Sequence, residues 1–324
     1  DTLKAAPALE RAECARDAGI AAVPGGAGAL RLVTVHPETN AADPLALVHD
    51  ANVDAVAIAT PVSTHFDLAV AAIEAGRHVL IEKPITRTSD EAKQLIALAE
   101  KRNVVLMVDH TFVYTGAVRK MRDLIAAGEL GDLFYFDSTR INFGLLRRDI
   151  NVVWDLAVHD LSILDYLLDA KPVTVQAFGS RHVMTDQDEI ASITLRYADG
   201  FHAHIRVSWV SPVKMRLALL AGSKKMVVYN DVVPSEKLKV YDRSFDFDSQ
   251  DDTAFKPVYR AGDVFIPTLD RAEALEVEAN HFLSCIREGT RPLTDGHAGL
   301  RLVQWLEAAQ RSMDSNGAFV SVEV

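Results

Sequence analysis

The sequence contains very little cysteine and no long hydrophobic run. Only Cys14 and Cys285 occur among its 324 residues, which excludes a disulfide framework and a cysteine-based zinc site and favours a reducing cytoplasm. No apolar stretch reaches the roughly 18 residues that cross a bilayer. The first residues lack a basic flank followed by an apolar core, so we expect neither a membrane span nor a signal peptide.

Basic residues are also in deficit. Lys and Arg number 34 against 45 for Asp and Glu, which gives a net charge of −11, and no basic cluster offsets it. A chain of this sign repels nucleic acid and anionic membranes, so we expect neither as a partner. Apolar residues make up 49% and charged residues 24%, which is a globular composition and excludes disorder, collagen and coiled coil. The length predicts two domains.

The first third of the chain alternates short apolar runs with amphipathic stretches. We predict strands at Val53–Ala59, His78–Ile81 and Val104–Val108, because these runs suit strands buried on both faces. The stretches between these strands are Phe66–Ala75 and a segment that begins at Ser89, and in both the apolar residues have helical spacing. Alternating strands and helices with short connections predict a parallel sheet with right-handed crossovers.

The glycines near the start do not form a dinucleotide-binding fingerprint. Gly26-x-Gly28-x-x-Arg31 lacks the third glycine. The following Leu30–Val35 is predicted to be a strand, whereas a phosphate would need the N-terminus of a helix there. We therefore predict a flexible loop over residues 19–31 and an irregular helix before it.

Beyond residue 130, strand candidates follow one another closely. They are Leu133–Thr139, Val173–Gly179, Ile190–Tyr197, His202–Val210, Arg216–Ala221 and Lys225–Tyr229, with helices at Val153–Leu168, Arg271–Glu288 and His297–Met313. The turn Asp199-Gly200 indicates a hairpin between two of the strands. This half is predicted to be a largely antiparallel sheet with helices on one face. Residues 242–268 lack periodicity and are predicted to be a long surface loop.

Glu82-Lys83-Pro84 directly follows a predicted strand. Ligands bind outside the carboxyl ends of strands in an open parallel sheet, so Lys83 is a candidate to project into such a crevice. A surface lysine before a proline-containing turn is the alternative.

Asp155 and His159 form the second candidate pair. Four residues apart at the start of a predicted helix, they share one helical face. A carboxylate beside an imidazole orients the ring and raises its basicity, which suits a general base near neutral pH. A helix-capping acid beside a satisfied histidine is the alternative. A metal site is disfavoured, because no third ligand stands at a telling distance.

Two further pairs of polar residues each allow more than one role. Arg147 and Arg148 could grip a phosphate through their planar forks, or could be a solvated pair. His202-x-His204 places two imidazoles on one strand face, which could bind a metal or simply face solvent or a neighbouring subunit.

Together the motifs resemble the Gfo/Idh/MocA oxidoreductase family over roughly residues 45–315, and their order and spacing are more specific than any single motif. The resemblance is closest to members that act on nucleotide-linked sugars, through His110–Arg119 and Trp154–Ala157. The motifs are Ala59-Thr60-Pro61 with His65, Glu82-Lys83-Pro84, Asp155-x-x-x-His159-Asp160 and Arg291-Pro292-Leu293-Thr294-Asp295-Gly296.

The resemblance implies a fold class of α/β plus α+β. An incomplete Rossmann parallel-sheet domain (residues 1–112) would precede an open, largely antiparallel sheet domain (residues 113–324) with helices on one face, and the open sheet would build a homodimer or homotetramer. The implied chemistry is hydride transfer between a sugar carbinol carbon and NAD or NADP. An inositol or free-sugar dehydrogenase and a noncatalytic sugar-binding or scaffold protein are the alternatives.

The resemblance also assigns candidate residues. Catalytic roles would belong to Lys83, Asp155 and His159, with His159 as proton acceptor. The cofactor would be bordered by Asp1, Ala59, Thr60, Pro61, His65, Glu82 and Lys83, and the sugar by His110, Arg140, Arg147, Arg148 and Asp160.

The chain departs from the family pattern at its beginning. The family's first strand, its Gly-x-Gly-x-x-Gly turn and its first helix have no counterpart, so the chain is expected to be truncated by about one unit of roughly 30 residues. Dinucleotide binding by the chain as it stands is therefore in question, because the missing unit holds the pyrophosphate.

Overall fold

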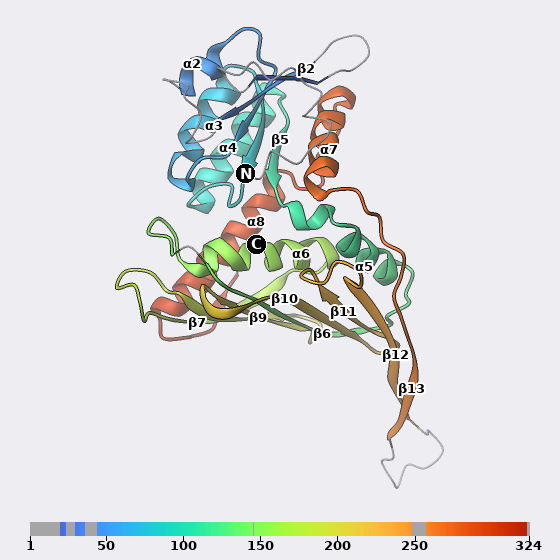
Figure 1. Cartoon of the computed structure of the whole chain (residues 1–324). Helices are drawn as coiled ribbons and strands as arrows, with labels where there is room; N and C mark the ends of the chain where they lie inside the picture. The colour runs from blue at the N-terminus through green and yellow to red at the C-terminus, as the bar shows by residue number, and fades with distance from the viewer. Residues whose placement is uncertain (1–19, 24–29, 36–43, 145, 248–256, 323–324) are drawn as a thin grey trace. The chain divides into compact units, whose positions relative to one another are not determined.

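The computed structural model describes residues 20–23, 30–35, 44–144, 146–247 and 257–322 (Figure 1). The chain forms two compact units. The first comprises residues 1–115, 272–307 and 324, and the second residues 116–271 and 308–323. Residues 272–307, which the sequence analysis assigns to the later domain, thus cluster with the first unit. The expected irregular helix over residues 1–18 and the candidate Asp1 lie outside the described residues.

The first unit contains a five-stranded sheet in the order β1-β2-β3-β4-β5. Strands β2 to β5 run parallel, which confirms the expected Rossmann-like sheet, and β1 pairs antiparallel with β2 at the edge. β1 falls in a region predicted as loop, so the loop prediction is wrong there. The strands are β1 (Ile20–Val23), β2 (Leu30–Val35), β3 (Ala55–Ile58), β4 (His78–Glu82) and β5 (Leu106–Asp109).

Helices connect the parallel strands. They are α2 (Pro44–His49), the short 3-10 helix η1 (Val62–Thr64), α3 (His65–Glu74) and α4 (Ser89–Arg102), with the 3-10 helix η2 (Thr111–Tyr114) following β5. The sequence pattern predicts α3 and α4 but not α2 or the two 3-10 helices. Thr88 caps α4 by accepting the backbone N–H of Glu91 at 3.2 Å, and Asn103 ends it in the left-handed region with φ 53°. All four residues of β3 are buried, as an unbroken apolar run requires.

The segment Arg291–Gly296 fastens the C-terminal helices of the first unit to its sheet. The backbone carbonyl oxygen of Thr294 accepts the Val108 N–H at 2.7 Å, and the Thr294 hydroxyl donates to the Val108 carbonyl oxygen at 2.7 Å. The Asp295 carboxylate accepts the Ala298 N–H at 2.9 Å, which caps helix α8 (Gly296–Asp314). The motif thus extends the edge of β5 and starts α8.

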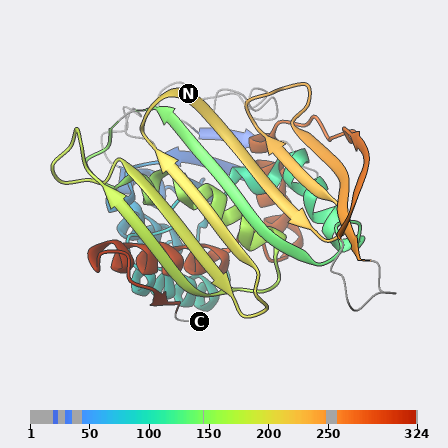
Figure 2. The same ribbon diagram turned by 90° about the horizontal axis from the view of Figure 1, so that it is seen from below.

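The second unit is built on a nine-stranded sheet in the order β13-β12-β11-β10-β6-β9-β8-β7-β14. All neighbours pair antiparallel except β6 and β9, which run parallel. The helices α5 (Gly116–Ala126) and α6 (Val158–Leu167) lie on one face, and Figure 2 shows the other face. The strands are β6 (Leu133–Phe143), β7 (Pro172–Ser180), β8 (Ile190–Tyr197), β9 (His202–Ser208), β10 (Val210–Gly222), β11 (Met226–Asn230), β12 (Leu238–Phe247), β13 (Pro257–Phe265) and β14 (Val320–Ser321).

The long surface loop predicted for residues 242–268 is wrong over most of its length. Strands β12 and β13 pair antiparallel there and form one edge of the sheet. Arg260 ties the pair together, because its guanidinium donates to Asp242 Oδ1 at 2.6 Å and to Ser244 Oγ at 2.9 Å. Edge strands tolerate a polar sequence without clean alternation, so cross-strand pairing rather than hydrophobic pattern determines these strands.

Strand β10 of this sheet carries apolar residues at both alternating sets of positions. On β10, Ala218 and Leu220 are buried at 2% and 0% exposure. The alternate positions Met215, Leu217 and Leu219 therefore point to the opposite face. Met215 is 36% exposed there.

Candidate functional site

The carboxyl ends of the parallel strands in the first unit carry the polar residues expected there. Thr60 follows β3, Glu82 ends β4 and is followed by Lys83, and Asp109 ends β5. This edge is where open parallel sheets bind ligands. Thr60, Glu82 and Lys83 belong to motifs that the sequence pattern identifies, whereas Asp109 belongs to none, although it ends its strand just as Glu82 does.

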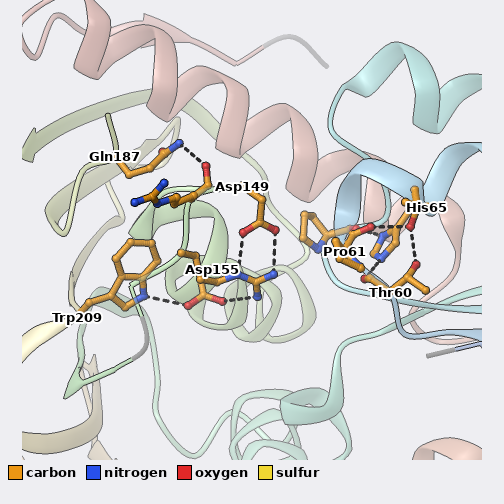
Figure 3. A network of polar contacts seen from close by, with 11 residues as sticks. Thr60, Pro61, His65, Asp149, Asp155, Gln187 and Trp209 are labelled. Atoms are coloured by element: carbon orange, nitrogen blue, oxygen red, sulfur yellow. Dashed lines mark hydrogen bonds and ion pairs between the residues drawn. The ribbon is translucent and has the colours of Figure 1, made fainter. Parts of the chain in front are cut away.

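His65 links the loops that follow two of these strands. It is 1% exposed, its Nε2 atom lies 2.8 Å from the carbonyl oxygen of Thr60, and its Nδ1 atom lies 3.0 Å from that of Pro84 (Figure 3). The ring thus fixes the loop after β3 against the Lys83–Pro84 segment after β4. The contacts give His65 a positioning role for these backbones at the proposed cofactor edge.

Three carboxyl groups gather beside Lys83. Glu82 and Asp109 are directly paired in the β4–β5 register, and Glu278 of helix α7 (Ala274–Glu288) is 1% exposed. Burial, together with the negative charge of Asp109, raises the pKa of Glu82 to about 8 against the opposing charge of Lys83. Burial, followed by the charges of Asp109 and Glu82, raises the pKa of Glu278 well above its ordinary value.

Glu278 was not identified from the sequence, although a signal existed. It lies four residues before Phe282 and seven before Cys285, and both of these are buried. This spacing places a carboxyl group on the buried stripe of α7. An acid at such a position is unusual enough to be a site candidate.

His110 directly follows β5 and is 1% exposed. Its backbone N–H donates to the Val108 carbonyl oxygen at 2.9 Å, and its backbone carbonyl oxygen accepts the Val113 N–H at 2.9 Å. The backbone of this candidate substrate residue therefore organises the turn into η2.

The first unit also contains a cavity of about 370 Å³ at the opposite, amino end of the strands. Its lining includes His78 and Val105, at the starts of β4 and β5, together with Glu100, Arg291 and His297. Burial lowers the pKa of His78, whose Nδ1 accepts the Val105 N–H at 2.9 Å. Ligands of parallel sheets bind at the carboxyl ends, so this cavity is not part of the candidate site.

The residues present fit one end of a dinucleotide better than the other. Thr60, Glu82 and Lys83 supply hydroxyl, carboxyl and ammonium groups at the strand ends, which suits the nicotinamide and its ribose. No glycine occurs between the end of β2 and the start of α2. A pyrophosphate needs a glycine turn that exposes backbone N–H groups at a helix N-terminus. Gly25, Gly26 and Gly28 follow β1, but the element after them is strand β2 and not a helix.

In the second unit, Asp155 lies in a one-turn π-helix, η3 (Val153–Ala157), that leads directly into α6. The predicted helix over residues 153–168 thus begins with wider turns, a feature frequent at functional sites. Asn151 caps this turn, since its Oδ1 accepts the N–H groups of Val153 at 3.0 Å and Trp154 at 3.3 Å. His159 is the second residue of α6 and is partly buried.

The Asp155 carboxylate is held on both oxygens. Trp209 donates its indole N–H to Oδ2 at 2.9 Å, and the Arg147 guanidinium lies 3.6 Å from Oδ1 (Figure 3). Arg147 also donates to both oxygens of Asp149, at 3.2 and 2.9 Å. Although partial burial opposes ionisation, Arg147 holds the pKa of Asp149 below its ordinary value. Trp209 was missed by the sequence analysis, because it is distant in sequence and belongs to no motif.

The candidate arginine pair is divided between two situations. Arg147 is engaged by Asp149 and Asp155, as an internal clamp. Arg148 is exposed, and its carbonyl accepts the side-chain N–H of Gln187 at 3.1 Å. The Arg147 side chain is 38% exposed, but two carboxylates already engage its guanidinium, so Arg148 is the better placed of the two for a phosphate contact from the surface.

Arg140 and Asp160 form a buried ion pair with each other. Nε of Arg140 donates to Asp160 Oδ2 at 2.6 Å and NH2 donates to Oδ1 at 3.3 Å, with the side chains 6% and 4% exposed. The pair joins β6 to α6 one residue after His159. Both residues were candidates for sugar binding, and these contacts assign them a structural role in fixing the helix that carries His159.

Asp160→Asn is expected to lower the free energy of unfolding by about 3 kcal/mol, because it removes a carboxylate charge that is buried against the Arg140 guanidinium. Asp169→Asn is the matched control, since Asp169 pairs with Arg122 but is 91% exposed. Its expected cost is below about 1 kcal/mol. Urea denaturation followed by circular dichroism measures both, and equal costs for the two variants would contradict the assignment.

No described helix has the length and apolar character needed to cross a membrane. Within the described part of the chain, no group of three or more His, Cys, Asp or Glu side chains is arranged to hold a metal ion.

Comparison with known proteins agrees with this architecture. The sequence matches the Oxidoreductase family, NAD-binding Rossmann fold, over residues 8–110 and the GFO/IDH/MocA C-terminal domain over residues 118–228. UDP-N-acetylglucosamine 3-dehydrogenase of Acidithiobacillus ferrooxidans is 32% identical over 266 residues, covering 78% of this chain and 76% of that protein. The scyllo-inositol 2-dehydrogenase (NAD(+)) of Bacillus subtilis is 25% identical over 274 residues, covering 80% and 75%.

Solved structures show the same fold. The structure of the UDP-N-acetylglucosamine 3-dehydrogenase from Acidithiobacillus ferrooxidans has a TM-score of 0.70 at 30% identity and covers 85% of this chain and 82% of its own. Levoglucosan dehydrogenase in complex with NADH and L-sorbose has a TM-score of 0.72 at 22% identity, with coverage of 87% and 83%. Two matched domains in order, and a relative above 30% identity along most of its length, show that the chain is an NAD-binding oxidoreductase and belongs to the Gfo/Idh/MocA family.

Proposed function

We propose that the protein is an NAD(P)-dependent dehydrogenase of a sugar, with a nucleotide-linked sugar as its substrate. The observation that carries this proposal is the 32% identity to UDP-N-acetylglucosamine 3-dehydrogenase along 76% of that relative. Retention of Lys83, Asp155 and His159 supports an enzyme rather than a sugar-binding scaffold.

The proposed reaction oxidises a carbinol carbon to a carbonyl. The bound nicotinamide supplies the acceptor for the hydride that leaves this carbon. His159 accepts the hydroxyl proton, so the C–H and O–H bonds break as the C=O bond forms. Lys83 stabilises the negative charge that develops on the oxygen. Asp155, fixed by Trp209 and Arg147, orients the imidazole.

Substrate class is tested, as are all turnover predictions below, on the chain extended ahead of Asp1 by a strand, glycine turn and helix, so that the cofactor site is intact. UDP-N-acetylglucosamine, scyllo-inositol and levoglucosan are assayed with NAD+ and NADP+, with NADH or NADPH absorbance as the readout. The kcat/KM for the nucleotide-linked sugar should exceed that for each of the other two sugars by about 10-fold or more, because a matched substrate leaves no buried polar group of the site unpaired. Preferred turnover of scyllo-inositol or levoglucosan would assign the inositol or free-sugar alternative. Binding of both sugar and NADH without turnover would instead assign the noncatalytic one.

We also propose that the open sheet face of the second unit joins two or four copies of the chain. Met215, Leu217 and Leu219 lie on that face, and a partly apolar face that its own helices do not cover favours burial against a second copy. Light scattering at micromolar concentration should give a dimer or tetramer, and Leu217→Glu should shift it toward monomer. A wild-type monomer would contradict this proposal.

A further inference from the structure

Three carboxyl groups from three elements meet at the strand edge that bears Lys83. Glu82 ends β4, and Asp109 ends β5 directly opposite it. Helix α7 packs against η2, the turn that follows Asp109, and Asp109, Glu82 and Thr111 are the groups that act on the Glu278 carboxyl group. Directly paired residues of neighbouring strands point to the same face, so the Glu82 and Asp109 side chains share one side of the sheet. Both are partly buried, whereas Glu278 is 1% exposed.

Glu278 is the unusual member. No hydrogen bond of normal length and angle reaches either of its carboxyl oxygens from the described residues, and both oxygens are out of contact with solvent. A carboxylate in such a position loses its hydration without compensation, whereas a protonated carboxyl group carries no charge to desolvate. The geometry therefore favours a proton on Glu278.

The protonation of the cluster depends on the charged and polar groups around it. Asp109 accepts the Thr111 N–H at 3.2 Å and is also hydrogen bonded by the Thr111 hydroxyl. Its negative charge acts on both glutamates, and the positive charge of Lys83 acts on Glu82. Three adjacent carboxylates with one neighbouring ammonium cannot all ionise at neutral pH, so the cluster holds protons.

We propose that Glu82, Asp109 and Glu278 form a proton-holding carboxyl cluster that positions Lys83. With protons on Glu82 and Glu278, the cluster keeps Glu82 from forming a salt bridge with the Lys83 ammonium, so that ammonium stays directed to the substrate oxygen. Loss of the Glu82 proton draws Lys83 to Glu82 instead. This inference rests on the proposed function for the role of Lys83, but the protonation of the cluster is independent of any substrate.

The cluster is tested on the full chain by NMR, with glutamate labelled at the carboxyl carbon and lysine labelled at Nζ. Two glutamate carboxyl signals should remain protonated at neutral pH, and one should titrate near 8. The Lys83 Nζ signal, assigned by its loss in Lys83→Ala, should move at the same midpoint. Ordinary glutamate titration at about 4.3 for every signal would overturn the cluster.

Three variants show which residues give the protonated signals and which residue shifts the Glu82 midpoint. Glu278→Gln should remove one protonated signal, and Asp109→Asn should lower the midpoint of the Glu82 signal by about one unit or more, because the opposing negative charge is gone. Glu276→Gln, two residues away on α7, is the matched control and should change neither signal. A Glu82 midpoint that Asp109→Asn leaves in place would overturn the coupling, and Glu278→Gln remains a separate test if that variant fails to fold.

Turnover then tests the link to Lys83. The rate should fall as pH rises through about 8, the value at which Glu82 loses its proton. In Asp109→Asn this fall should begin at a lower pH, by the same interval as the NMR midpoint. If the NMR shifts but neither the Lys83 signal nor the alkaline fall follows, the cluster stands and its positioning of Lys83 is overturned. Absence of turnover with every sugar, by contrast, would overturn the proposed function alone.

Stability should depend on the same protons. Because Glu82 and Glu278 bind protons more tightly in the folded chain than in the unfolded one, stability falls as pH rises from their ordinary range toward 8 and beyond. Glu278→Gln removes one of these groups and should raise the Tm at about pH 9 by roughly 2–4 °C or more. Thermal scans at about pH 5 and pH 9 check this, and a variant no more stable than wild type at the higher pH contradicts it.

Discussion

His159→Asn is expected to lower turnover by about 100- to 10,000-fold while leaving cofactor affinity nearly unchanged. Asparagine keeps the approximate size of the side chain and a hydrogen-bonding amide, but it cannot accept a proton from a hydroxyl group at neutral pH. Steady-state kinetics with the preferred sugar, together with NADH titration, separate the two effects.

Lys83→Ala is the comparison that distinguishes the roles. Removing one preorganised charge from the developing oxyanion should cost about 100- to 1,000-fold in turnover, with some loss of sugar affinity. If His159→Asn keeps near-normal turnover while Lys83→Ala abolishes it, then Lys83 is the proton acceptor and the proposed roles are reversed.

The clamp around Asp155 gives a graded series. Asp155→Asn should reduce turnover less than His159→Asn, because an orienting group is one step removed from the proton transfer. Trp209→Phe removes the indole N–H that the Asp155 carboxylate accepts at 2.9 Å, together with part of a ring that is 1% exposed. Its effect on the turnover of folded protein should be milder still, and a thermal scan of the same variant measures the separate cost of the smaller ring. On the acid side, turnover should fall once the His159 imidazole is protonated, because an imidazolium cannot accept the hydroxyl proton.

The sequence predicts the parallel sheet well because β3 and β5 are buried on both faces and have nearly continuous apolar sequences, and because β4, whose residues alternate between buried and half-buried, keeps an apolar centre. It fails at β12 and β13, where an edge position removes the need for alternation and cross-strand contacts of Arg260 supply the order. Local pattern thus determines the buried strands, and pairing determines the edge.

The candidate site divides in the same way. Lys83, Asp155 and His159 belong to short motifs, so they can be identified from the sequence alone. Trp209 reaches Asp155 across 54 residues, and Glu278 joins Glu82 and Asp109 only because α7 packs in the first unit. Contacts of this kind depend on tertiary structure, and only an acid on an apolar helical stripe gave a signal for Glu278.

A chain of the printed 324 residues is expected to bind NADH at least about 100-fold more weakly than the same chain extended ahead of Asp1 by a strand, glycine turn and helix. The extension, a strand, glycine turn and helix of the dinucleotide-binding type, would place backbone N–H groups and a helix N-terminus against the pyrophosphate. Each hydrogen bond to a charged group contributes about 1.5–3 kcal/mol, so two or three such bonds account for that factor or more.

The control for this comparison is the same extension with the second glycine of its turn replaced by valine. That glycine lets the backbone approach the pyrophosphate, so the valine version should bind NADH no better than the printed chain. Titration followed by NADH fluorescence measures all three proteins. Micromolar affinity in the printed chain would contradict the prediction, because Thr60, Glu82 and Lys83 would then hold the dinucleotide without a pyrophosphate cradle.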